Sequence, residues 1–363
     1  MNNSSLFLKK LDWPLLASVA LLLVFSFLTF YNLDQASNQF LMRHAVFVPF
    51  SILVMLGAAF FDYRIFKNHS TASVLLYTGA LILLGLVFAF QEIRGVSAWI
   101  VLSSFTIQPV EFAKIAVVIL LAKYFSQKHT EVNNPSQIIV SGLYVGIPFV
   151  MVLFQPDFGS ALVFAVTWVI LLFFSGINKR NIFSMIIIGV TLLVIIWFFI
   201  FEDYQKARIL SFSDPYKDPK GQGYHLIQSK IAIGSGGIFG NIWKGDDAYQ
   251  IIVPEPYTDF VFTSFSNKFG FVGVVAVIST FAFLMMRLVT IASRFSKDNF
   301  SRFFIIGFLG ILITHFLVNI GMNLGLLPIT GIPLPFLSYG GSHLIAMMTG
   351  VGIVQSIVVR SGG

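Results

Sequence analysis

Between two long apolar segments near its C-terminal end, the chain reads Leu326-Leu327-Pro328-Ile329-Thr330-Gly331-Ile332-Pro333-Leu334-Pro335-Phe336-Leu337-Ser338-Tyr339-Gly340-Gly341-Ser342. Its three prolines and three glycines cannot continue a membrane-spanning helix. Irregular backbone beside a bilayer must pack inside protein or line a cavity, because hydrocarbon leaves free N–H and C=O groups unsatisfied. The sequence therefore predicts a structured interruption here; the simpler alternative is a kinked connector between two helices.

The composition on either side of this stretch is that of a membrane protein. Hydrophobic residues make up 56% of the chain, charged residues 11%, and the mean hydropathy is +0.85, whereas soluble domains carry roughly 25% charged residues. We expect an all-α polytopic protein forming a single membrane domain over 1–363, with about ten transmembrane helices of roughly 20 residues each. The spans are predicted near 13–33, 44–62, 72–90, 109–125, 137–154, 159–176, 181–201, 269–290, 303–325 and 341–359.

The basic residues predict the orientation. Placing the N-terminus inside assigns most Lys and Arg residues to cytoplasmic segments and leaves only Arg43, Arg94 and Lys114 on or near short outer ones, as the positive-inside rule requires. We therefore expect a multi-pass membrane protein with both termini in the cytoplasm and a retained first helix. We attribute the net charge of +7 to the orientation of the helices and to attraction to anionic lipid. We expect no nucleic-acid partner. The chain has no cysteine, which excludes disulfides and thiolate chemistry.

One long segment, 202–268, is predicted to lie outside the membrane between the seventh and eighth helices. A loop of this length in a compact fold is usually functional. It contains several turn-forming pairs, and His225 to Ile233 is predicted to form a short amphipathic helix at the outer surface. The spaced apolar residues are too few for a separate core, so we expect the segment to pack on the outer face of the bundle.

Eight stretches of the chain resemble, in order, the signatures of the SEDS family, typified by RodA and FtsW. Besides 326–342, they are Arg94-Gly95-Val96-Ser97-Ala98-Trp99-Ile100, Gln108-Pro109-Val110-Glu111-Phe112-Ala113-Lys114, Gln155-Pro156-Asp157-Phe158-Gly159-Ser160-Ala161, Arg208-Ile209-Leu210-Ser211-Phe212 with Asp214-Pro215, Gly223-Tyr224-His225-Leu226-Ile227-Gln228-Ser229, Ile231 to Gly240, and Pro254-Glu255-Pro256-Tyr257-Thr258-Asp259-Phe260-Val261-Phe262. The resemblance covers essentially the whole chain, which makes it more specific than a lone motif.

This resemblance implies a peptidoglycan glycosyltransferase that polymerises lipid II, an undecaprenyl-pyrophosphate-linked disaccharide peptide, at the outer face of the membrane. It also implies a class B penicillin-binding protein as partner and a role in cell shape and elongation. The short N-terminal tail, the total length and the Leu11-Asp12-Trp13 opening favour the elongation type, RodA, over the division type, FtsW. No cofactor is certain, although a divalent cation, Mg²⁺ or Mn²⁺, is compatible with the reaction.

Glycan transfer needs a base for the attacking hydroxyl and positive charge for the departing pyrophosphate. Asp259 corresponds to the family's catalytic aspartate, and its alternative role is to cap the following helix. Glu111 and Lys114 share one helix face at the outer start of the fourth span, where they form either a neutralising pair or part of a substrate cavity. The other predicted substrate-binding residues are Asp157, which is equally suited to capping, and Arg208, Lys230 and Arg94, for which simple solvation is the alternative.

The chain departs from the family pattern at two places. Ser266-Asn267-Lys268 replaces a stretch that carries two acids in relatives, and Ala98 replaces a basic residue before the tryptophan. If water separates Lys268 from Asp259, the coupling between them is weak, and Lys268→Glu is expected to be tolerated.

Two other classes of function compete with the enzyme. A lipid II flippase or transporter would place its site near the bilayer midplane on broken helices, often in repeated halves. A non-enzymatic scaffold of a wall-synthesis complex would need no convergent acid and bases. The outer clustering of the polar residues and the lack of an evident repeat favour the enzyme.

Overall fold

The computed structural model describes residues 7, 9–31, 37–90, 98–102, 105–128, 134–199, 206, 212, 215–217, 222–242, 255–295 and 298–360. A helix covers most of each predicted span: α2 (Trp13–Phe30), α3 (Ser37–Phe60), α5 (Ser70–Leu86), α6 (Pro109–Lys128), α7 (Pro135–Leu153), α8 (Phe158–Phe174), α9 (Lys179–Phe199), α12 (Val261–Arg294), α13 (Asn299–Leu324) and α14 (Gly341–Arg360). The shorter elements are α4 (Arg64–Asn68), α11 (Gln222–Ser235), the 3₁₀ turns η1 (Val87–Ala89) and η2 (Pro215–Lys217), and an antiparallel hairpin of β1 (Ile100–Leu102) and β2 (Phe105–Ile107).

The membrane character of these helices follows from their length and composition. Among the described residues, seven helices are long and apolar enough to cross a membrane, namely α2, α3, α5, α7, α12, α13 and α14, and α8 is a shorter apolar helix of 17 residues. The predicted all-α polytopic fold is therefore confirmed. The count of ten crossings stays a prediction.

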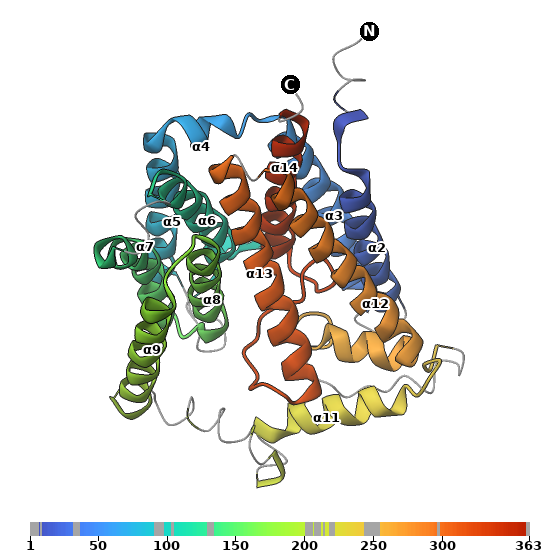
Figure 1. The fold of residues 1–363 in the computed structure, drawn as a ribbon. Coiled ribbons are helices and arrows are strands. Elements are labelled where there is room, and N and C mark those ends of the chain that lie inside the picture. Colours follow the sequence, from blue (N-terminus) through green and yellow to red (C-terminus); the bar gives the residue numbers. More distant parts are fainter. Residues whose placement is uncertain are drawn as a thin grey trace.

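Helix α13 is the centre of the bundle. It packs against α6, α8 and α12, while α14 packs chiefly against α3, and α2 lies along α12 (Figure 1). In the most apolar 18-residue stretch of α13, 83% of the residues are buried inside the protein, whereas the share is 22% for α3 and for α7. Polar residues on α13 therefore face protein, where they need partners.

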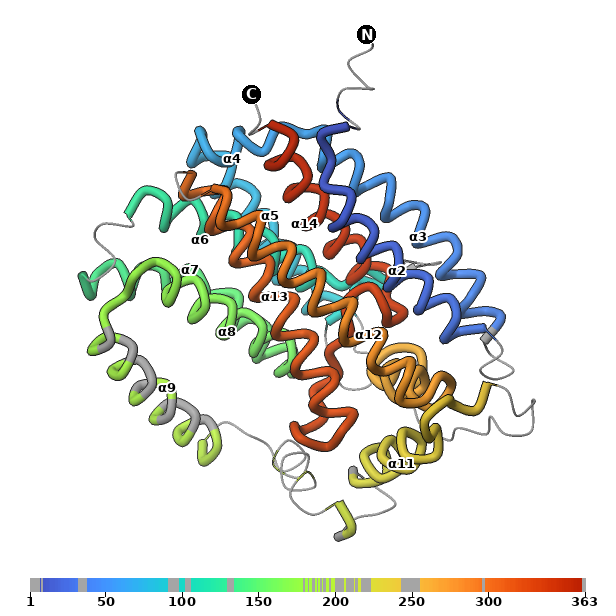
Figure 2. The backbone as a smooth tube through the Cα atoms, turned by 45° about the vertical axis from the view of Figure 1, so that its right-hand side comes forward, coloured from blue at the N-terminus to red at the C-terminus, as the bar shows by residue number. Residues whose placement is uncertain are grey.

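Helix α12 begins earlier than its predicted span and is broken. The expected loop 202–268 ends in eight helical residues, because α12 starts at Val261 and not near 269. Gly270 interrupts it with φ 65° and ψ −161°, a combination open essentially to glycine alone. The part before Gly270 lies across the bundle beside α11, and the remainder runs along the bundle (Figure 2). The helix predicted at 225–233 is confirmed as α11, which extends over Gln222–Ser235.

The irregular segment, Leu326–Gly340, packs inside the protein as its sequence predicts. Ile332, Leu334 and Leu337 are buried in the core, and Phe336 holds a positive φ of 62°. The hydroxyl of Ser338 donates to the carbonyl of Thr258 at 2.6 Å. Neighbouring protein groups thus satisfy backbone polar atoms that lipid would leave unpaired.

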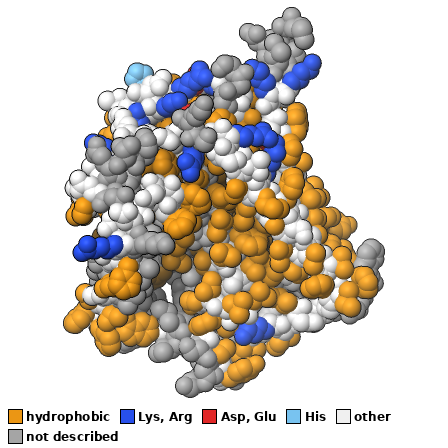
Figure 3. Space-filling view, in the orientation of Figure 1, with side chains coloured by type: hydrophobic (Ala, Val, Ile, Leu, Met, Phe, Trp, Pro, Cys, Tyr) orange, Lys and Arg blue, Asp and Glu red, His pale blue; other side chains and the backbone are white. Residues whose placement is uncertain are grey.

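The first and last helices meet at the end of the bundle opposite α11 (Figure 1). The backbone N–H of Asp12 donates to Gln355 Oε1 at 2.8 Å, and Arg287 forms an ion pair with Asp12 at 2.7 Å. Lys and Arg side chains gather at this same end, above a broad hydrophobic flank (Figure 3). The start of α2 and the end of α14 therefore lie on one side, and the assignment of that side to the cytoplasm stays a prediction.

Candidate functional site

Asp259 lies directly before α12, next to the irregular segment. The N-cap position of α12 is occupied by Phe260, which directly follows Asp259. A Cβ atom built on Gly331, whose φ is 75°, would lie 3.5 Å from Asp259 Oδ2. The carboxylate therefore lies beside bare backbone of the irregular segment, and the side chain is partly exposed.

Two asparagines of α13 hold the backbone at this position. The side-chain amides of Asn319 and Asn323 each donate to the Asp259 carbonyl at 3.0 Å. Asn319 also donates to the carbonyl of Ile332 at 2.8 Å, and Asn323 Oδ1 accepts from the backbone N–H of Thr263 at 3.1 Å. Helix α13 thus fixes the start of α12 and the irregular segment relative to each other.

A second polar group, the buried network, consists of Glu111, Lys114, His315 and His343. Lys114 Nζ lies 2.8 Å from Glu111 Oε1 and 3.0 Å from His315 Nε2. Glu111 Oε2 lies 2.8 Å from His343 Nδ1, and His315 Nδ1 lies 2.9 Å from the carbonyl oxygen of Pro333. Each of the four residues is at most 3% exposed. Charges so deeply buried are stable only when paired and hydrogen-bonded, as they are here.

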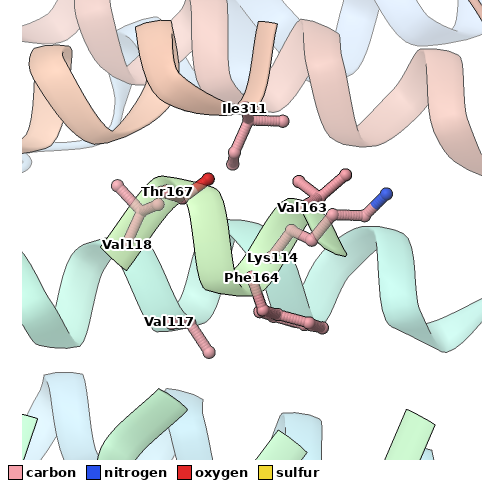
Figure 4. Close-up of a pocket in the computed structure, with 7 residues that line it drawn as sticks. All are labelled: Lys114, Val117, Val118, Val163, Phe164, Thr167 and Ile311. Atoms are coloured by element: carbon pink, nitrogen blue, oxygen red, sulfur yellow. The ribbon is translucent and has the colours of Figure 1, made fainter. Parts of the chain in front are cut away.

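The stem of Lys114 passes an apolar crevice before it reaches this network. The crevice is lined by Lys114, Val117, Val118, Val163, Phe164, Thr167 and Ile311. The lysine extends past Val163 and carries its nitrogen away from Val117 and Val118 (Figure 4). The aliphatic stem is therefore packed while the ammonium is held by polar partners.

Four consecutive residues, Thr330–Pro333, connect the two groups. Gly331 faces Asp259, Ile332 is held by Asn319, and Pro333 bonds to His315. Helix α8 meets the same stretch from another side, because a Cβ atom on its Gly159 would come within 2.9 Å of the Thr330 carbonyl oxygen. The stretch that interrupts the spanning helices thus links Asp259, the buried network and the start of α8.

Asp157 is the N-cap of α8. Its sequence position had left this capping role open as an alternative to substrate binding. Its Oδ1 accepts from the backbone N–H of Ser160 at 3.0 Å. Burial raises the pKa of Asp157, against the opposing hydrogen bond from Ser160 and the charge of Lys114, while Glu111 raises it further. Asp157 therefore lies within the electrostatic field of Lys114 and Glu111.

The basic residues among the other predicted substrate-binding residues are less closely gathered. Lys230 is exposed on α11, and its side chain covers Gly325, the left-handed residue that ends α13. Arg94 and Arg208 lie outside the described residues. The structure thus groups Glu111 with Lys114, places Asp157 and Asp259 on two sides of Thr330–Pro333, and leaves Lys230 at the end of α13.

Lys268 departs from its expected setting. It is 2% exposed, and Nζ donates to the carbonyls of Thr29, at 3.5 Å, and Tyr31, at the C-terminal end of α2. Lys268 is thus buried and bonded to protein carbonyls, a setting that argues against the expected tolerance of Lys268→Glu. A cation suits this position because helix C-termini carry partial negative charge and unpaired carbonyls.

The buried network does not fit Mg²⁺ or Mn²⁺. Glu111, His315 and His343 offer one ligand atom each within 4.8 Å of one another. Both cations prefer oxygen ligands, whereas two of these groups are imidazoles. The Lys114 ammonium already bonds to Glu111 and His315. No catalytic step is therefore assigned to a cation in this cluster.

Sequence reasoning missed the two histidines and two asparagines that organise the site. His315, Asn319 and Asn323 recur at intervals of four in a strongly apolar segment, so they form one polar stripe on a helix. Polar and ionisable residues inside a spanning helix are a signal of function in themselves. His343 directly follows Ser342, the last residue of the 326–342 stretch, and therefore lies outside that motif.

Comparison with known proteins places these features in a wider group. A model of the cell cycle proteins FtsW, RodA and SpoVE matches residues 8–362. The peptidoglycan glycosyltransferase MrdB of Escherichia coli K12 is 36% identical over 351 residues, which cover 96% of this chain and 93% of MrdB. A chain of a solved peptidoglycan synthase complex, in which polymerization and crosslinking are coordinated, matches with a TM-score of 0.81 and 33% identity over 96% of this chain and 97% of that one. The crystal structure of the rod shape determining protein RodA of Thermus thermophilus matches with a TM-score of 0.72 and 28% identity over 96% of each chain.

Proposed function

Because the chain belongs to the FtsW, RodA and SpoVE family of cell cycle proteins, as its motifs predicted, we propose that it is a peptidoglycan glycosyltransferase of the elongation type. Its substrate is lipid II, which it polymerises into glycan strands at the outer face of the bacterial cytoplasmic membrane. The names of MrdB and of the rod shape determining protein support this activity and this cellular role.

The observation that carries the proposal is the position of Asp259 beside Gly331. A carboxylate here is partly exposed, and its backbone is held by Asn319 and Asn323. Asp259 takes the proton from the acceptor sugar hydroxyl as that oxygen attacks the anomeric carbon of the donor. The bond between this carbon and the pyrophosphate oxygen breaks, and the lipid pyrophosphate leaves with the bonding electrons. General-base assistance of this kind contributes about 10²–10⁴ in rate.

Lys114 supplies positive charge for the departing pyrophosphate. A fixed cation in a site of low dielectric stabilises developing negative charge without reorganisation. Glu111 neutralises the lysine in the resting protein, and their 2.8 Å contact keeps the pair in place. Asp157, Arg94, Arg208 and Lys230 are retained as substrate-binding residues in this proposal, with Lys230 the exposed cation among the described ones.

The partner is a class B penicillin-binding protein that crosslinks the new strand. The solved synthase complex, to one chain of which this protein is similar over 97% of that chain's length, supports the pairing. A divalent cation, Mg²⁺ or Mn²⁺, takes no part in the steps described above, and one that accompanies the substrate pyrophosphate is treated as substrate.

One assay tests the proposal against its two competitors. Purified protein with its partner, in vesicles that hold labelled lipid II, is expected to produce glycan polymer. Lipid II that crosses the bilayer as monomer, without polymer, would instead indicate a flippase. Neither product from folded protein and partner would indicate a scaffold. Asp259→Asn is the matched control, because it keeps the size of the side chain and removes its basicity.

A further inference from the structure

Resting on the proposed function, we infer that His315 is a positioning residue that orients the Lys114 ammonium and the Pro333 carbonyl together, as the Nδ1–H tautomer. His315 touches neither reacting group directly in this assignment. It acts through Lys114, the proposed cation of the leaving group, and through Thr330–Pro333, the stretch that faces Asp259.

The tautomer follows from the partners of the two ring nitrogens. Lys114 Nζ has donors and no acceptor, so at 3.0 Å from His315 Nε2 it must donate to that nitrogen. Nε2 therefore carries a lone pair, and the proton of the neutral ring is on Nδ1. The Pro333 carbonyl, 2.9 Å from Nδ1, can only accept. Both bonds are made at once by one tautomer, and the imidazolium form would place two cations in contact.

The second histidine closes the other side of the network. His343 Nδ1 lies 2.8 Å from Glu111 Oε2, while Lys114 bonds to Oε1 of the same carboxylate. The two imidazole rings lie 4.8 Å apart between centroids. Lys114 is thus held from α6 by Glu111 and from α13 by His315, and Glu111 is held from α14 by His343. Three helices fix one ammonium.

The position of that ammonium is coupled to the irregular segment through His315 alone among these four residues. Glu111, Lys114 and His343 bond within the network, whereas His315 also bonds to Pro333. Gly331, two residues earlier, is the neighbour of Asp259. His315 therefore sets the spacing between the cation and the segment beside the base, and a misplacement of about 1 Å in such a pair costs about 10² in rate.

The first experiment determines the tautomer and needs no activity. Protein labelled with ¹⁵N-histidine is examined by NMR in lipid nanodiscs, and the His315 signals are identified by their loss in His315→Gln or His315→Asn, whichever folds. The inference requires a protonated Nδ1 and an unprotonated Nε2. An Nε2–H tautomer or an imidazolium at neutral pH overturns it. Since this readout is independent of polymerisation, failure of the proposed function leaves the test intact.

The second experiment uses two variants that each keep one of the two bonds. His315→Gln places an amide oxygen where Nε2 accepts from Lys114, and His315→Asn places an amide N–H where Nδ1 donates to Pro333. We expect kcat on lipid II to fall about 10²-fold for His315→Asn and less for His315→Gln, with KM within about threefold of the parent. His44→Gln, which alters another buried imidazole bonded to Ser26, is expected to keep parental kcat.

The outcomes separate positioning from packing. A role in packing alone predicts equal losses for the two His315 variants that follow their thermal stability, and that result overturns the inference. A parental kcat for His315→Asn also overturns it. Asp259→Asn is measured in parallel, so that an active Asp259→Asn variant rejects the proposed base while the comparison of the two His315 variants still stands.

Discussion

Asn323 donates from its side-chain amide to the backbone carbonyl of Asp259 at 3.0 Å, so the candidate base is held by a residue 64 positions further along the chain. The oxygen of the same amide accepts from the N–H and the hydroxyl of Thr263, at 3.1 and 2.5 Å. One side chain of α13 therefore satisfies polar groups on both sides of the start of α12.

Removal of this amide should affect both stability and catalysis. Asn323→Ala leaves the N–H of Thr263 buried without its acceptor, and we expect a loss of about 1–3 kcal/mol in unfolding free energy. The start of α12 shifts as well, so kcat should fall more than KM rises. Thermal unfolding and lipid II kinetics of the purified variant measure the two effects. Parental kcat in a folded variant would contradict the role of Asn323 in placing Asp259.

Asp259→Asn should abolish most polymerisation while leaving the fold intact. Loss of a general base lowers the rate by about 10²–10⁴. Asparagine keeps the size of the side chain and can also cap a helix, so abundance, melting temperature and partner binding should match the parent. Asp259→Glu retains a displaced carboxylate and should keep a trace of activity. Near-parental polymerisation by Asp259→Asn would move the assignment to Asp157 or Glu111.

Asp157 is expected to act on stability in a pH-dependent way. Since burial raises its pKa, the folded protein binds this proton more tightly than the unfolded chain, whose Asp pKa is about 3.9. The contribution of Asp157 to unfolding free energy is therefore greatest below that value and declines as pH rises through the folded pKa.

Asp157→Asn tests this pH dependence because asparagine also caps helices well. In this variant the unfolding free energy should no longer decline as pH rises, and α8 should stay as stable as in the parent. Asp157→Ala should lower the unfolding free energy by about 1 kcal/mol, because the cap of α8 is lost. Chemical denaturation at several pH values measures both. If the stability of Asp157→Asn depends on pH as that of the parent does, another group is responsible for the titration. The polymerase activity of the Asp157→Asn variant shows whether Asp157 also binds substrate.

Lys268→Glu should be strongly destabilising. A carboxylate in place of the buried ammonium would face the carbonyls of Thr29 and Tyr31 without a donor, and an uncompensated buried charge costs roughly 3–5 kcal/mol. Lys268→Met, which keeps the stem, should be milder. Lys230→Glu, on an exposed surface, serves as the control and should stay within about 0.5 kcal/mol of the parent in unfolding free energy. Equal melting temperatures for Lys268→Glu and the parent would reject this account.

The orientation in the membrane is open to a direct test, because the chain has no cysteine. Gln127 lies near the end of α6, and Gln222 begins α11. A single cysteine at 222 should react with an impermeant maleimide added to intact cells, whereas one at 127 should react only after permeabilisation. Labelling of position 127 from outside would reverse the proposed topology.

The sequence predicted the helices well because their apolar runs are long. It also predicted that 326–342 packs inside protein, since three prolines and three glycines leave few alternatives. The start of α12 was misplaced because Ser264, Ser266, Asn267 and Lys268 resemble loop residues. Each finds a partner in the fold, such as the Ala232 carbonyl, which accepts from Asn267 Nδ2 at 2.8 Å.

The candidate site was only partly predictable. Glu111 and Lys114 are three residues apart, so their pairing follows from helical geometry alone. Their contacts with His343 and His315 join residues more than 200 positions apart, and no local pattern encodes such a contact. Asp157 and Asp259 looked alike in sequence as capping residues, and the structure shows the cap bond of Asp157 to Ser160 while it places Phe260 at the N-cap of α12.

The break at Gly270 has a consequence for how the end of the bundle that carries α11 moves. Backbone N–H groups of Asn241 and Ile242 donate to the carbonyls of Asn267 and Lys268, and those of Phe271 and Val272 donate back to Gly237 and Ile238. A Cβ on Gly270 would lie only 2.6 Å from the Ile238 oxygen, so the two strips of backbone are in contact. Asn267 also bonds to the Ala232 carbonyl of α11. We therefore expect α11 and the first part of α12 to move as one unit. A spectroscopic label at the exposed Ile231 on α11 would therefore report any displacement of Asp259 during turnover, from a position that leaves the site unaltered.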